Sequence, residues 1–581
     1  MTGFLDDLAL RSATWQAFER LVARYLFARG FDSVRVVGGS GDGGADVIAT
    51  INDKRWLVQA KKWDRPVGEE VLEETLKAAR NYGAEMAVVA SKQGFTQSVH
   101  DRLHQDSFGG IAVQLWDVPR LVELGNRLPT EAPAEGRPDD YALRPYQEDA
   151  VQAVFREWDS DSSGRAMVVM ATGLGKTFVA ASVIRRIANL RPGLRVLVLA
   201  HTNPLLRQLE VAFWPFLRKD EATLVANSEE KFDRDMLGRI SYVFASRDTF
   251  DSVVKAGGEL PKFDLVLVDE CHHLGTESYG RVLERLDVGS ADGPFMLGLT
   301  ATDWRPDGES LRPLLGEPVI RVDLVQGLKS GFLTNVDYRM YTDNIDWDSL
   351  REDRGGRYSP KAINRSLFVK EWDDAVVGHI RDAWREIQSP RGIVFCSTIE
   401  HAKKLAAQIS AEEFTKAEAI YSGHGLLPVE RNKRLWDFSD GRIGILCAVD
   451  VLNEGVDVPD VNLVVFQRVT HSRRIFVQQL GRGLRRAYGK DKVVVLDFVN
   501  DVRRFAAGLH LQGELEGDGP KVGSPETISV GSTVGFRRAN SSDVEGASFL
   551  REWLGDVGAL EDAGEDVSIL EFPDPRLVPE R

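Results

Sequence analysis

The hydrophobic and polar positions along the chain first divide it at about residue 128. Before that point, apolar residues recur at helical spacing over residues 15–28, and a second helix is predicted over residues 71–82. Short apolar runs bounded by glycine-rich turns predict strands at residues 34–37, 46–49, 56–60 and 86–90. We therefore expect residues 1–128 to form one compact α/β domain.

Beyond residue 141 the pattern changes to buried strands that alternate with helices. One series of apolar runs covers residues 166–170, 195–200, 242–245, 265–268 and 295–299. A second series covers residues 392–395, 418–421, 443–447, 463–466 and 493–497. This alternation is typical of parallel sheets with helices on both faces. It predicts two doubly wound α/β domains, at residues 141–335 and 336–505, with a mixed segment near residues 340–390.

Composition changes this picture at two places and bounds the class of protein. Residues 129–140 are rich in proline, glycine and acid, which suits an exposed linker, and the weakly periodic tail 506–581 is acidic. A net charge of −15 excludes a uniformly basic nucleic-acid binder but allows a local basic channel. Three scattered cysteines, no signal peptide and no long apolar stretch favour the cytoplasm and argue against a membrane protein.

A glycine-rich turn joins the strand at 166–170 to a helix-like stretch at 178–188. It reads Ala-Thr-Gly-Leu-Gly-Lys-Thr at residues 171–177, with Met170 where the strict motif has glycine. Backbone N–H groups of such a turn, around Thr172, Gly173 and Gly175, can cradle phosphates at a helix N-terminus. Lys176 can reach the β- and γ-phosphates and the Thr177 hydroxyl can ligate Mg²⁺, which predicts hydrolysis of a nucleoside triphosphate.

Two further segments of the first doubly wound domain fit the same chemistry. Asp269 and Glu270 follow the strand at 265–268, where Asp269 can hold Mg²⁺ and Glu270 can activate the attacking water. Thr300 and Thr302 follow the next strand, and the carboxyl edge of a parallel sheet faces the nucleotide. His272 and His273, beside the acidic pair, suit coupling between sites or simple packing.

The second doubly wound domain contributes two more candidate segments. Gly455 and Asp457 lie in the first of them, and Arg482 and Arg485 lie in the second. These arginines could cross a cleft and stabilise charge on the γ-phosphate, or they could bind nucleic-acid phosphates. The two uses are compatible.

Seven motifs of the chain resemble, in their order and spacing, those of superfamily II helicases and translocases. They are LRPYQ (143–147), ATGLGKT (171–177), DECH (269–272), TAT (300–302), VFCST (394–398), NEGVDVP (453–459) and QQLGRGLR (478–485). The resemblance implies two RecA-like domains that bind ATP and move along nucleic acid. The motif set resembles that of restriction-enzyme motors and repair helicases more than that of DEAD-box RNA helicases. This likeness implies weakly sequence-specific binding to the backbone of double-stranded DNA.

The same resemblance implies a role for each matching residue. It implies adenine contacts at Arg144 and Gln147, and an Mg²⁺–ATP site at Lys176, Thr177, Asp269 and Glu270. Thr300 and Thr302 would couple hydrolysis to movement. From the second domain, Arg482 and Arg485 would reach the nucleotide, and Gly455 and Asp457 would complete the nucleotide-binding set.

The N-terminal domain carries a second set of candidates. Asp46 opens one predicted strand, and Gln59 and Lys61 lie on the next at the i, i+2 spacing that shares a face. A carboxylate, a second oxygen and a lysine suit Mg²⁺-dependent hydrolysis of a phosphodiester, with Glu19 as a further carboxylate and Asp42 ranked below Asp46. Trp63, beside Lys61, is a candidate DNA contact. Two alternatives stay open: an ordinary turn and solvated strand edge, and a domain that clamps nucleic acid without cutting it.

Five segments of this domain, taken in order, are similar to Mrr-like restriction endonucleases of the PD-(D/E)xK group. They are FERLVARYLFARGF, GGSGDGGADV, LVQAKKW, ASKQGFTQSV and LWDVPRLVEL. This resemblance implies Asp46, Gln59 and Lys61 as the catalytic core, with Glu19 in support. Gln59 stands where the wider group has an acid, so the number and affinity of bound metal ions are open.

Together these features predict an ATP-driven double-stranded DNA motor fused to a Mg²⁺-dependent endonuclease that cleaves foreign or modified DNA in restriction or phage defence. The alternatives are a repair helicase–nuclease for damaged or branched DNA, and an ATP-driven remodeller whose N-terminal domain only binds DNA. A separate methyltransferase or other defence partner is expected, since no S-adenosylmethionine signature is found in the sequence. A dimer would allow double-strand cleavage.

Overall fold

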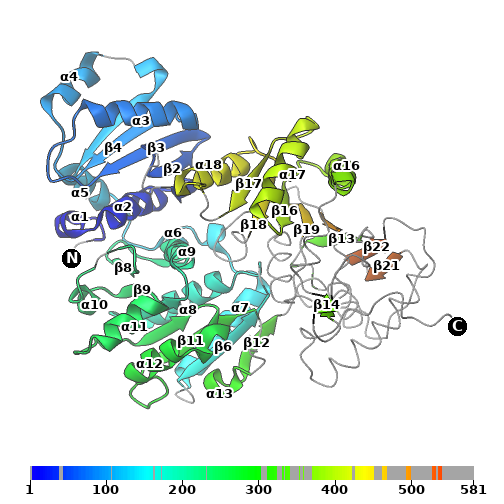
Figure 1. The fold of residues 1–581 in the computed structure, drawn as a ribbon. Coiled ribbons are helices and arrows are strands. Elements are labelled where there is room, and N and C mark those ends of the chain that lie inside the picture. Colours follow the sequence, from blue (N-terminus) through cyan, green and yellow to red (C-terminus); the bar gives the residue numbers. More distant parts are fainter. Residues whose placement is uncertain are drawn as a thin grey trace. The chain divides into compact units, whose positions relative to one another are not determined.

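The fold was obtained as a computed structural model. It describes residues 3–37, 44–105, 108–160, 164–171, 173–230, 232–301, 310–322, 330, 332, 334–340, 352–353, 357–358, 370–421, 425–449, 461–467, 492–498, 527–530 and 534–538. The chain divides into two compact units, one of residues 1–170 with 175–321 and one of residues 171–174 with 322–581 (Figure 1). Each unit is described by itself.

The N-terminal domain of the first unit is built on a five-stranded sheet of order β1-β2-β3-β4-β5. Strands β1 to β3 are antiparallel and β3 to β5 are parallel. Helix α2 contacts β1, β2 and β3, whereas α3 contacts β3 and β4. The elements are α1 (Asp7–Ser12), α2 (Trp15–Ala28), β1 (Ser33–Val36), β2 (Val47–Ile51), β3 (Lys54–Lys61), α3 (Glu69–Tyr82), β4 (Met86–Ser91), α4 (Gln97–Gln105), β5 (Ala112–Asp117) and α5 (Val118–Asn126).

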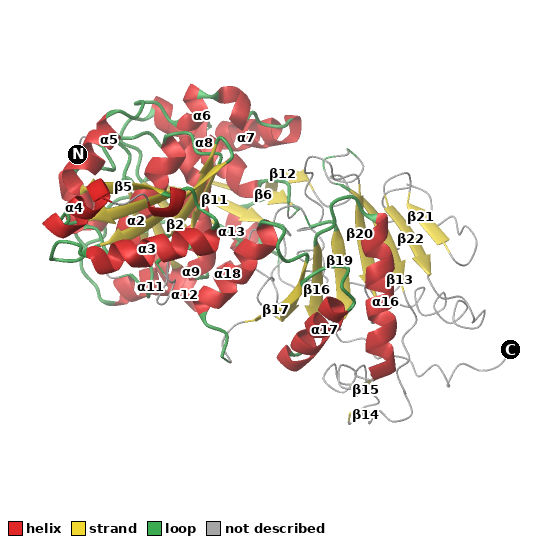
Figure 2. Cartoon of the chain, turned by 90° about the horizontal axis from the view of Figure 1, so that it is seen from above, coloured by secondary structure: helices red, strands yellow, loops and turns green. Residues whose placement is uncertain are grey.

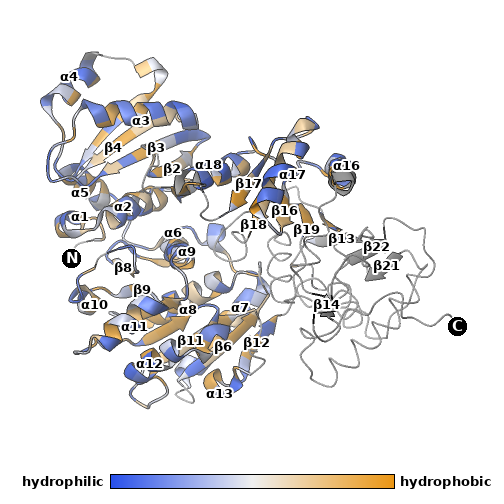
Figure 3. Cartoon of the chain, viewed as in Figure 1, coloured by the Kyte–Doolittle hydropathy of each residue, from blue (hydrophilic) through white to orange (hydrophobic). Residues whose placement is uncertain are grey.

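The central domain of the first unit has a seven-stranded sheet of order β12-β6-β11-β10-β7-β9-β8. The pairs from β6 to β8 are all parallel, and β7, β10 and β11 consist only of buried residues. The strands are β6 (Arg165–Met170), β7 (Val196–Ala200), β8 (Thr223–Ala226), β9 (Tyr242–Ser246), β10 (Leu265–Val268), β11 (Phe295–Thr300) and β12 (Pro318–Val322). Figure 3 shows these strands as hydrophobic and the surrounding helices as largely hydrophilic on their outer sides.

One helix of the central domain precedes the first strand of that sheet, and the others lie between its successive strands, as the predicted alternation requires (Figure 2). They are α7 (Pro145–Asp159), α8 (Lys176–Leu190), α9 (Asn203–Phe213), α10 (Met236–Arg239), α11 (Arg247–Lys255), α12 (Glu277–Arg285) and α13 (Arg312–Leu315), with 3₁₀ turns η3 (Trp214–Phe216) and η4 (Cys271–Gly275). In the described part of the chain, every helix is too short or too polar to cross a membrane.

The second unit contains an eight-stranded sheet of order β17-β18-β16-β19-β20-β13-β22-β21. Its strands are β13 (Asn335–Met340), β16 (Gly392–Cys396), β17 (Ala417–Tyr421), β18 (Ile445–Val449), β19 (Leu463–Gln467), β20 (Lys492–Asp497), β21 (Thr527–Val530) and β22 (Val534–Arg538). Its helices are α16 (Lys370–Glu386), α17 (Ile399–Ala411) and α18 (Pro428–Ser439), and a separate ribbon pairs β14 (Glu352–Asp353) with β15 (Arg357–Tyr358).

The structure confirms the predicted α/β class and refines the account of the C-terminal tail. Strands β21 and β22 lie within residues 506–581, and β22 pairs with β13 in parallel while β21 pairs with β22 in antiparallel. The tail therefore supplies the edge of the second sheet. Its remaining residues lie outside those described.

The predicted linker is mostly exposed, but one turn of it is anchored to the central domain. Residues 129–140 include the short helix α6 (Pro133–Gly136) and the start of η2 (Pro138–Tyr141), and Ala132 is buried. The Glu135 carboxylate accepts hydrogen bonds of 3.0 Å from Arg218 Nη2 and from Asn189 Nδ2. The connection between the two domains of the first unit is therefore pinned rather than free.

Two buried arginines on α2 join the N-terminal domain to the central domain. Arg20 lies 2.7 Å from Glu210 and 2.8 Å from Glu230, and Arg24 donates to the backbone carbonyls of Glu221 and Arg218 at 2.8 and 2.9 Å. We call these contacts the docking seam.

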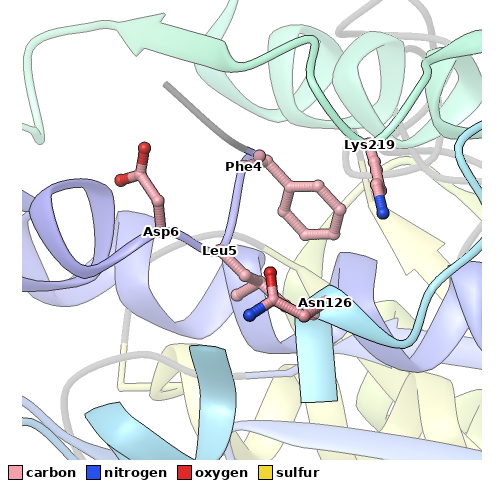
Figure 4. A pocket seen from close by; sticks show the side chains of 7 residues that line it. Phe4, Leu5, Asp6, Asn126 and Lys219 are labelled. Carbon is pink, nitrogen blue, oxygen red and sulfur yellow. The ribbon is translucent and has the colours of Figure 1, made fainter. Parts of the chain in front are cut away.

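The chain's beginning adds a further contact to the docking seam. The Phe4 amide donates to the Lys219 carbonyl at 2.7 Å, and Lys219 Nζ donates to the Leu128 carbonyl at 3.1 Å. Figure 4 shows Lys219 at one side of a small pocket that Phe4, Leu5, Asp6 and Asn126 also line. Because the seam includes buried charges, its contacts hold the two domains as parts of one unit.

Candidate active sites

The phosphate loop lies between β6 and α8, as its sequence predicts. Gly173 and Gly175 adopt φ values of +92° and +86°, a backbone region that residues with a side chain rarely occupy. Gly175 caps the N-terminus of α8, so the first residue of that helix is Lys176. Lys176 is 9% exposed, and its Nζ donates to the Met170 carbonyl at 3.3 Å. The lysine is thus folded into the cradle where phosphates would bind.

The acidic pair stands on the neighbouring part of the same sheet edge. Strand β11 lies between β6 and β10, so the carboxyl ends of all three strands meet at one edge. Asp269 directly follows β10 and is 4% exposed, and Glu270 Oε1 lies 3.9 Å from Lys176 Nζ. Glu270 has a left-handed backbone at φ +48°, which turns the chain sharply after Asp269.

Electrostatics make the acidic pair suitable for a divalent cation. Burial, together with the adjacent Glu270 carboxylate, raises the pKa of Asp269 well above its ordinary range. Asp269 Oδ1 is buried and has no hydrogen-bond partner among the described residues. A buried carboxylate oxygen that lacks a donor is a good ligand for Mg²⁺, so these residues fit that ion.

His272 links the acidic pair to the following strand. Its Nδ1 lies 3.3 Å from Glu270 Oε2 and 3.3 Å from the hydroxyl of Thr300, the last residue of β11. The His272 and His273 rings lie 4.3 Å apart, and so do those of His273 and His201 at the end of β7. These contacts run from the end of β7 to the end of β11, and the role of the two histidines stays a prediction.

Gln147 also lies against the phosphate loop. Its Oε1 accepts from the Arg144 amide at 2.9 Å, which caps α7, and a Cβ on Gly175 would lie 2.6 Å from its Nε2. The glycine therefore leaves room for the glutamine amide beside the loop. The other predicted nucleotide contacts lie outside the described residues: Thr172, Thr302, Gly455, Asp457, Arg482 and Arg485.

The N-terminal candidates gather where β2 and β3 run side by side. Asp46 immediately precedes β2 and is buried, and its Oδ2 accepts a 2.6 Å hydrogen bond from the Ala60 amide of β3. This bond fixes the carboxylate beside the segment that carries Gln59 and Lys61. Gln59 is fully buried, whereas the Lys61 side chain is 21% exposed. The structure thus brings all three predicted core residues to neighbouring positions on two paired strands.

Sequence reasoning missed one residue of this site, Glu74 on α3. Glu74 Oε2 accepts from Gln59 Nε2 at 2.8 Å and lies 3.6 Å from Lys61 Nζ. Its position three residues after the buried Val71, on the same helix face, was a signal available in the sequence. The core therefore has a second carboxylate close to Gln59.

The predicted supporting residues have different outcomes. Glu19 is buried on α2, which packs on β2 and β3, but its part in the site stays a prediction. Asp42 lies outside the described residues. Arg65 stacks over the Trp63 ring at 4.9 Å, and Lys61 Nζ lies 5.9 Å from the same ring. This basic and aromatic surface beside Lys61 suits a nucleic-acid strand.

Each site offers few protein ligands for a metal ion. No group of three or more His, Cys, Asp or Glu residues in the described ranges could hold one. Mg²⁺ commonly binds one or two carboxylates and takes its other ligands from substrate phosphates and water. Asp269 in one site, and Asp46 with Glu74 in the other, fit that pattern.

Comparison with known families assigns these regions. Residues 10–125 match the family described as restriction endonuclease (Mrr_cat), residues 140–305 match the type III restriction enzyme res subunit, and residues 375–487 match the helicase conserved C-terminal domain. The matches confirm both resemblances expected from the sequence. The matches place a restriction endonuclease domain before the helicase-type regions of the chain.

Curated relatives match about three fifths of this chain. A Schizosaccharomyces pombe protein assigned as the mitochondrial ATP-dependent helicase irc3 is 30% identical over 65% of this chain and 60% of its own length. The EcoAI type I restriction enzyme endonuclease subunit of Escherichia coli is 26% identical over 61% of this chain and 46% of its own. The DNA 3'-5' translocase XPB2 of Sulfurisphaera tokodaii is 27% identical over 62% and 81%.

The chain thus spans less than two thirds of the length of two of these relatives. What can be assigned to it directly is its set of domains. The chain carries an N-terminal restriction endonuclease domain followed by the two domains of a helicase.

Proposed function

We propose that this protein is an ATP-driven translocase on double-stranded DNA whose Mg²⁺-dependent endonuclease domain cleaves foreign or modified DNA in restriction or phage defence. The observation that carries the proposal is the presence, in one structural unit, of a phosphodiesterase core at Asp46, Gln59 and Lys61 and an ATPase core at Lys176, Asp269 and Glu270. One unit that holds both suits a machine in which movement delivers DNA for cutting.

The residues of the ATPase core divide the work of hydrolysis. Lys176 would bind and neutralise the β- and γ-phosphates, and Asp269 and Thr177 would hold Mg²⁺. Glu270 would orient and deprotonate the attacking water, and His272 joins it to Thr300 at the end of β11. Mg²⁺ would neutralise charge that develops on the phosphates.

The residues of the nuclease core suit the hydrolysis of a DNA phosphodiester. Asp46 would hold the metal ion, and Lys61 would stabilise negative charge on the scissile phosphate. The Trp63 ring, with Arg65 over it, would contact the strand beside the cut. A divalent ion bound here supplies an activated water and polarises the phosphate.

The cellular setting follows from the same chemistry. Contact with phosphates predicts salt-sensitive binding with weak sequence specificity. Discrimination of foreign DNA would then depend on its modification, read by this chain, by a defence partner or by a separate methyltransferase. We place the protein in the cytoplasm, where phage DNA arrives. One nuclease core cuts one strand, so double-strand cleavage would use two protomers or two successive events.

A cleavage panel tests the proposal. Methylated plasmid, unmodified plasmid, linear DNA and branched DNA are each incubated with the full chain and Mg²⁺, with and without ATP. We expect DNA-stimulated ATP hydrolysis, and cleavage that differs between the two plasmids and responds to ATP. Nicked plasmid should precede linear product if single chains act in succession.

Each other outcome of the panel contradicts part of the proposal. Cleavage confined to branched DNA would replace restriction with repair. DNA-stimulated ATP hydrolysis with tight binding and no cleavage of any substrate would leave only a remodeller whose N-terminal domain clamps DNA.

A further inference from the structure

The hydrogen bonds of Gln59 define the orientation of its amide. Its Oε1 accepts from the hydroxyl of Thr75, and its Nε2 donates to Glu74 Oε2 at 2.8 Å. An ionised carboxylate can only accept hydrogen bonds, so the amide nitrogen must face Glu74 and the oxygen must face Thr75. Both polar atoms of the Gln59 side chain therefore face partners on α3 inside the domain.

Glu74 is better placed to meet a cation than Gln59 is. Its side chain is 44% exposed, whereas Gln59 is fully buried. Lys61 Nζ, 3.6 Å from Glu74 Oε2, holds the carboxylate on the side of the site where the reactive lysine lies. A hydrated ion can therefore reach Glu74 from solvent and remain beside the catalytic strand.

Gly44 gives the space in which Glu74 approaches the strands. It has φ +90°, and a Cβ built on it would lie 2.7 Å from Glu74 Cγ and 3.2 Å from Gln59 Nε2. Any side chain at residue 44 would push Glu74 away from Gln59. The absence of a side chain at residue 44, two residues before Asp46, thus allows the Glu74 carboxylate to lie beside Gln59.

We infer that Glu74, supplied by helix α3, is the second metal-ligating carboxylate of the nuclease site, and that Gln59 is a positioning residue that holds Glu74. The ligand is a divalent cation of the Mg²⁺ class. This inference rests on the proposed nuclease function. It explains how the site keeps two acids although Gln59 occupies a strand position at which an acid is expected.

Metal binding tests the inference without reference to cleavage. Mn²⁺ is titrated calorimetrically into the full chain without nucleotide, in an Asp269→Asn background that removes the other carboxylate site. Glu74→Gln should weaken Mn²⁺ binding by about tenfold or more. Glu73→Gln is the matched control, because Glu73 precedes Glu74 on α3 but pairs with Arg102, and it should bind Mn²⁺ like its parent.

Two comparisons separate positioning from ligation. Gln59→Leu should weaken Mn²⁺ binding less than Glu74→Gln does, and the double variant should bind no more weakly than Glu74→Gln alone. Thermal melting of every variant checks that the domain is folded. Independent, additive losses would overturn the positioning role of Gln59.

Asp46→Asn separates this inference from the function on which it rests. If Asp46→Asn abolishes Mn²⁺ binding and a folded Glu74→Gln does not change it, the inference is wrong and the nuclease assignment stands. If neither substitution changes Mn²⁺ binding, the site holds no metal ion and both proposals are wrong.

Discussion

The two candidate sites of this chain both stand at the ends of buried strands, yet they are assembled differently. Lys176 follows β6 through the phosphate loop, Asp269 follows β10 and Thr300 ends β11, and because these three strands are neighbours in one parallel sheet, its order brings the residues to one edge. In the N-terminal domain, Asp46, Gln59 and Lys61 lie on one strand pair, but Glu74 arrives from a helix. The first core follows from topology, whereas the second depends on how one helix packs.

The cores also differ in their contact with solvent. Asp269 and Lys176 are almost fully buried, while Lys61 and Glu74 keep part of their side chains exposed. A buried core strengthens electrostatic interactions and admits a small nucleotide, whereas a more open core can receive a long polymer. Substitutions in the buried core should therefore have the larger effects.

The largest effect is expected at the buried core. Lys176→Ala removes the cation that faces Glu270 and the phosphates, and should lower DNA-stimulated ATP hydrolysis by at least about 100-fold. Phosphate release assays measure this, with the exposed Lys262→Ala as a control at wild-type rate. Persistent turnover would show that the glycine-rich loop is not the ATP site.

Lys61→Ala should produce the converse separation of activities. Loss of the ammonium group should reduce Mg²⁺-dependent nicking by about 100-fold and leave ATP hydrolysis unchanged, because the two cores share no side chain. Plasmid nicking and phosphate release are measured on the same preparation, with the exposed Lys77→Ala on α3 as control. Equal nicking by Lys61→Ala and wild type would contradict the nuclease assignment.

An effect on stability rather than on turnover is expected where the domains that carry the two cores meet. Arg20→Met leaves Glu210 and Glu230 without their buried partner, which should cost about 3–5 kcal/mol of unfolding free energy. Arg11→Met, which breaks only an exposed pair with Asp7, should change stability by less than about 1 kcal/mol. Denaturant melts that show equal stability for the two variants would argue against the docking seam.

The smallest expected effect is a pH dependence of the stability that Glu135 in the linker contributes. Burial alone would raise the pKa of Glu135, but hydrogen bonds from Arg218, the Ala132 amide and Asn189, with the charge of Arg185, lower it from 4.5 to about 2. Because folding lowers this pKa, the stabilisation is complete above pH 4.5 and disappears as the pH falls toward 2.

Glu135→Gln should therefore lower Tm by about 2 °C at pH 7. The gap between variant and wild type should narrow between pH 4.5 and 2 in thermal melts. A gap that does not depend on pH would mean that Glu135 acts through its shape rather than its charge.

The same contrast explains what the sequence could predict. Continuous apolar runs indicated strands such as β7 and β10, and short contiguous motifs identified Lys176 and Asp269, because sheet order converts such motifs into a site. Strand β8 was missed because its apolar run is only three residues long, and β5 because only one of its residues is fully buried.

The nuclease core was only partly predictable for a physical reason. The strand spacing of Gln59 and Lys61 was enough to place both on one face, but the amide orientation of Gln59 depends on Thr75 and Glu74 of a separate helix. A pattern of periodicity gives the face of a helix and not the side-chain hydrogen bonds that cross to a strand.

The docking seam also limits how freely the N-terminal domain could be exchanged between proteins. Arg20 and Arg24 sit on a helix of the cutting domain but find their partners in Glu210, Glu230 and backbone carbonyls of the motor. A cutting domain grafted onto another motor would bring two buried cations to a surface without matching acceptors. Exchange of such domains, in evolution or in the laboratory, would have to carry α9 and the 221–230 segment along, so the heritable module is larger than the catalytic domain.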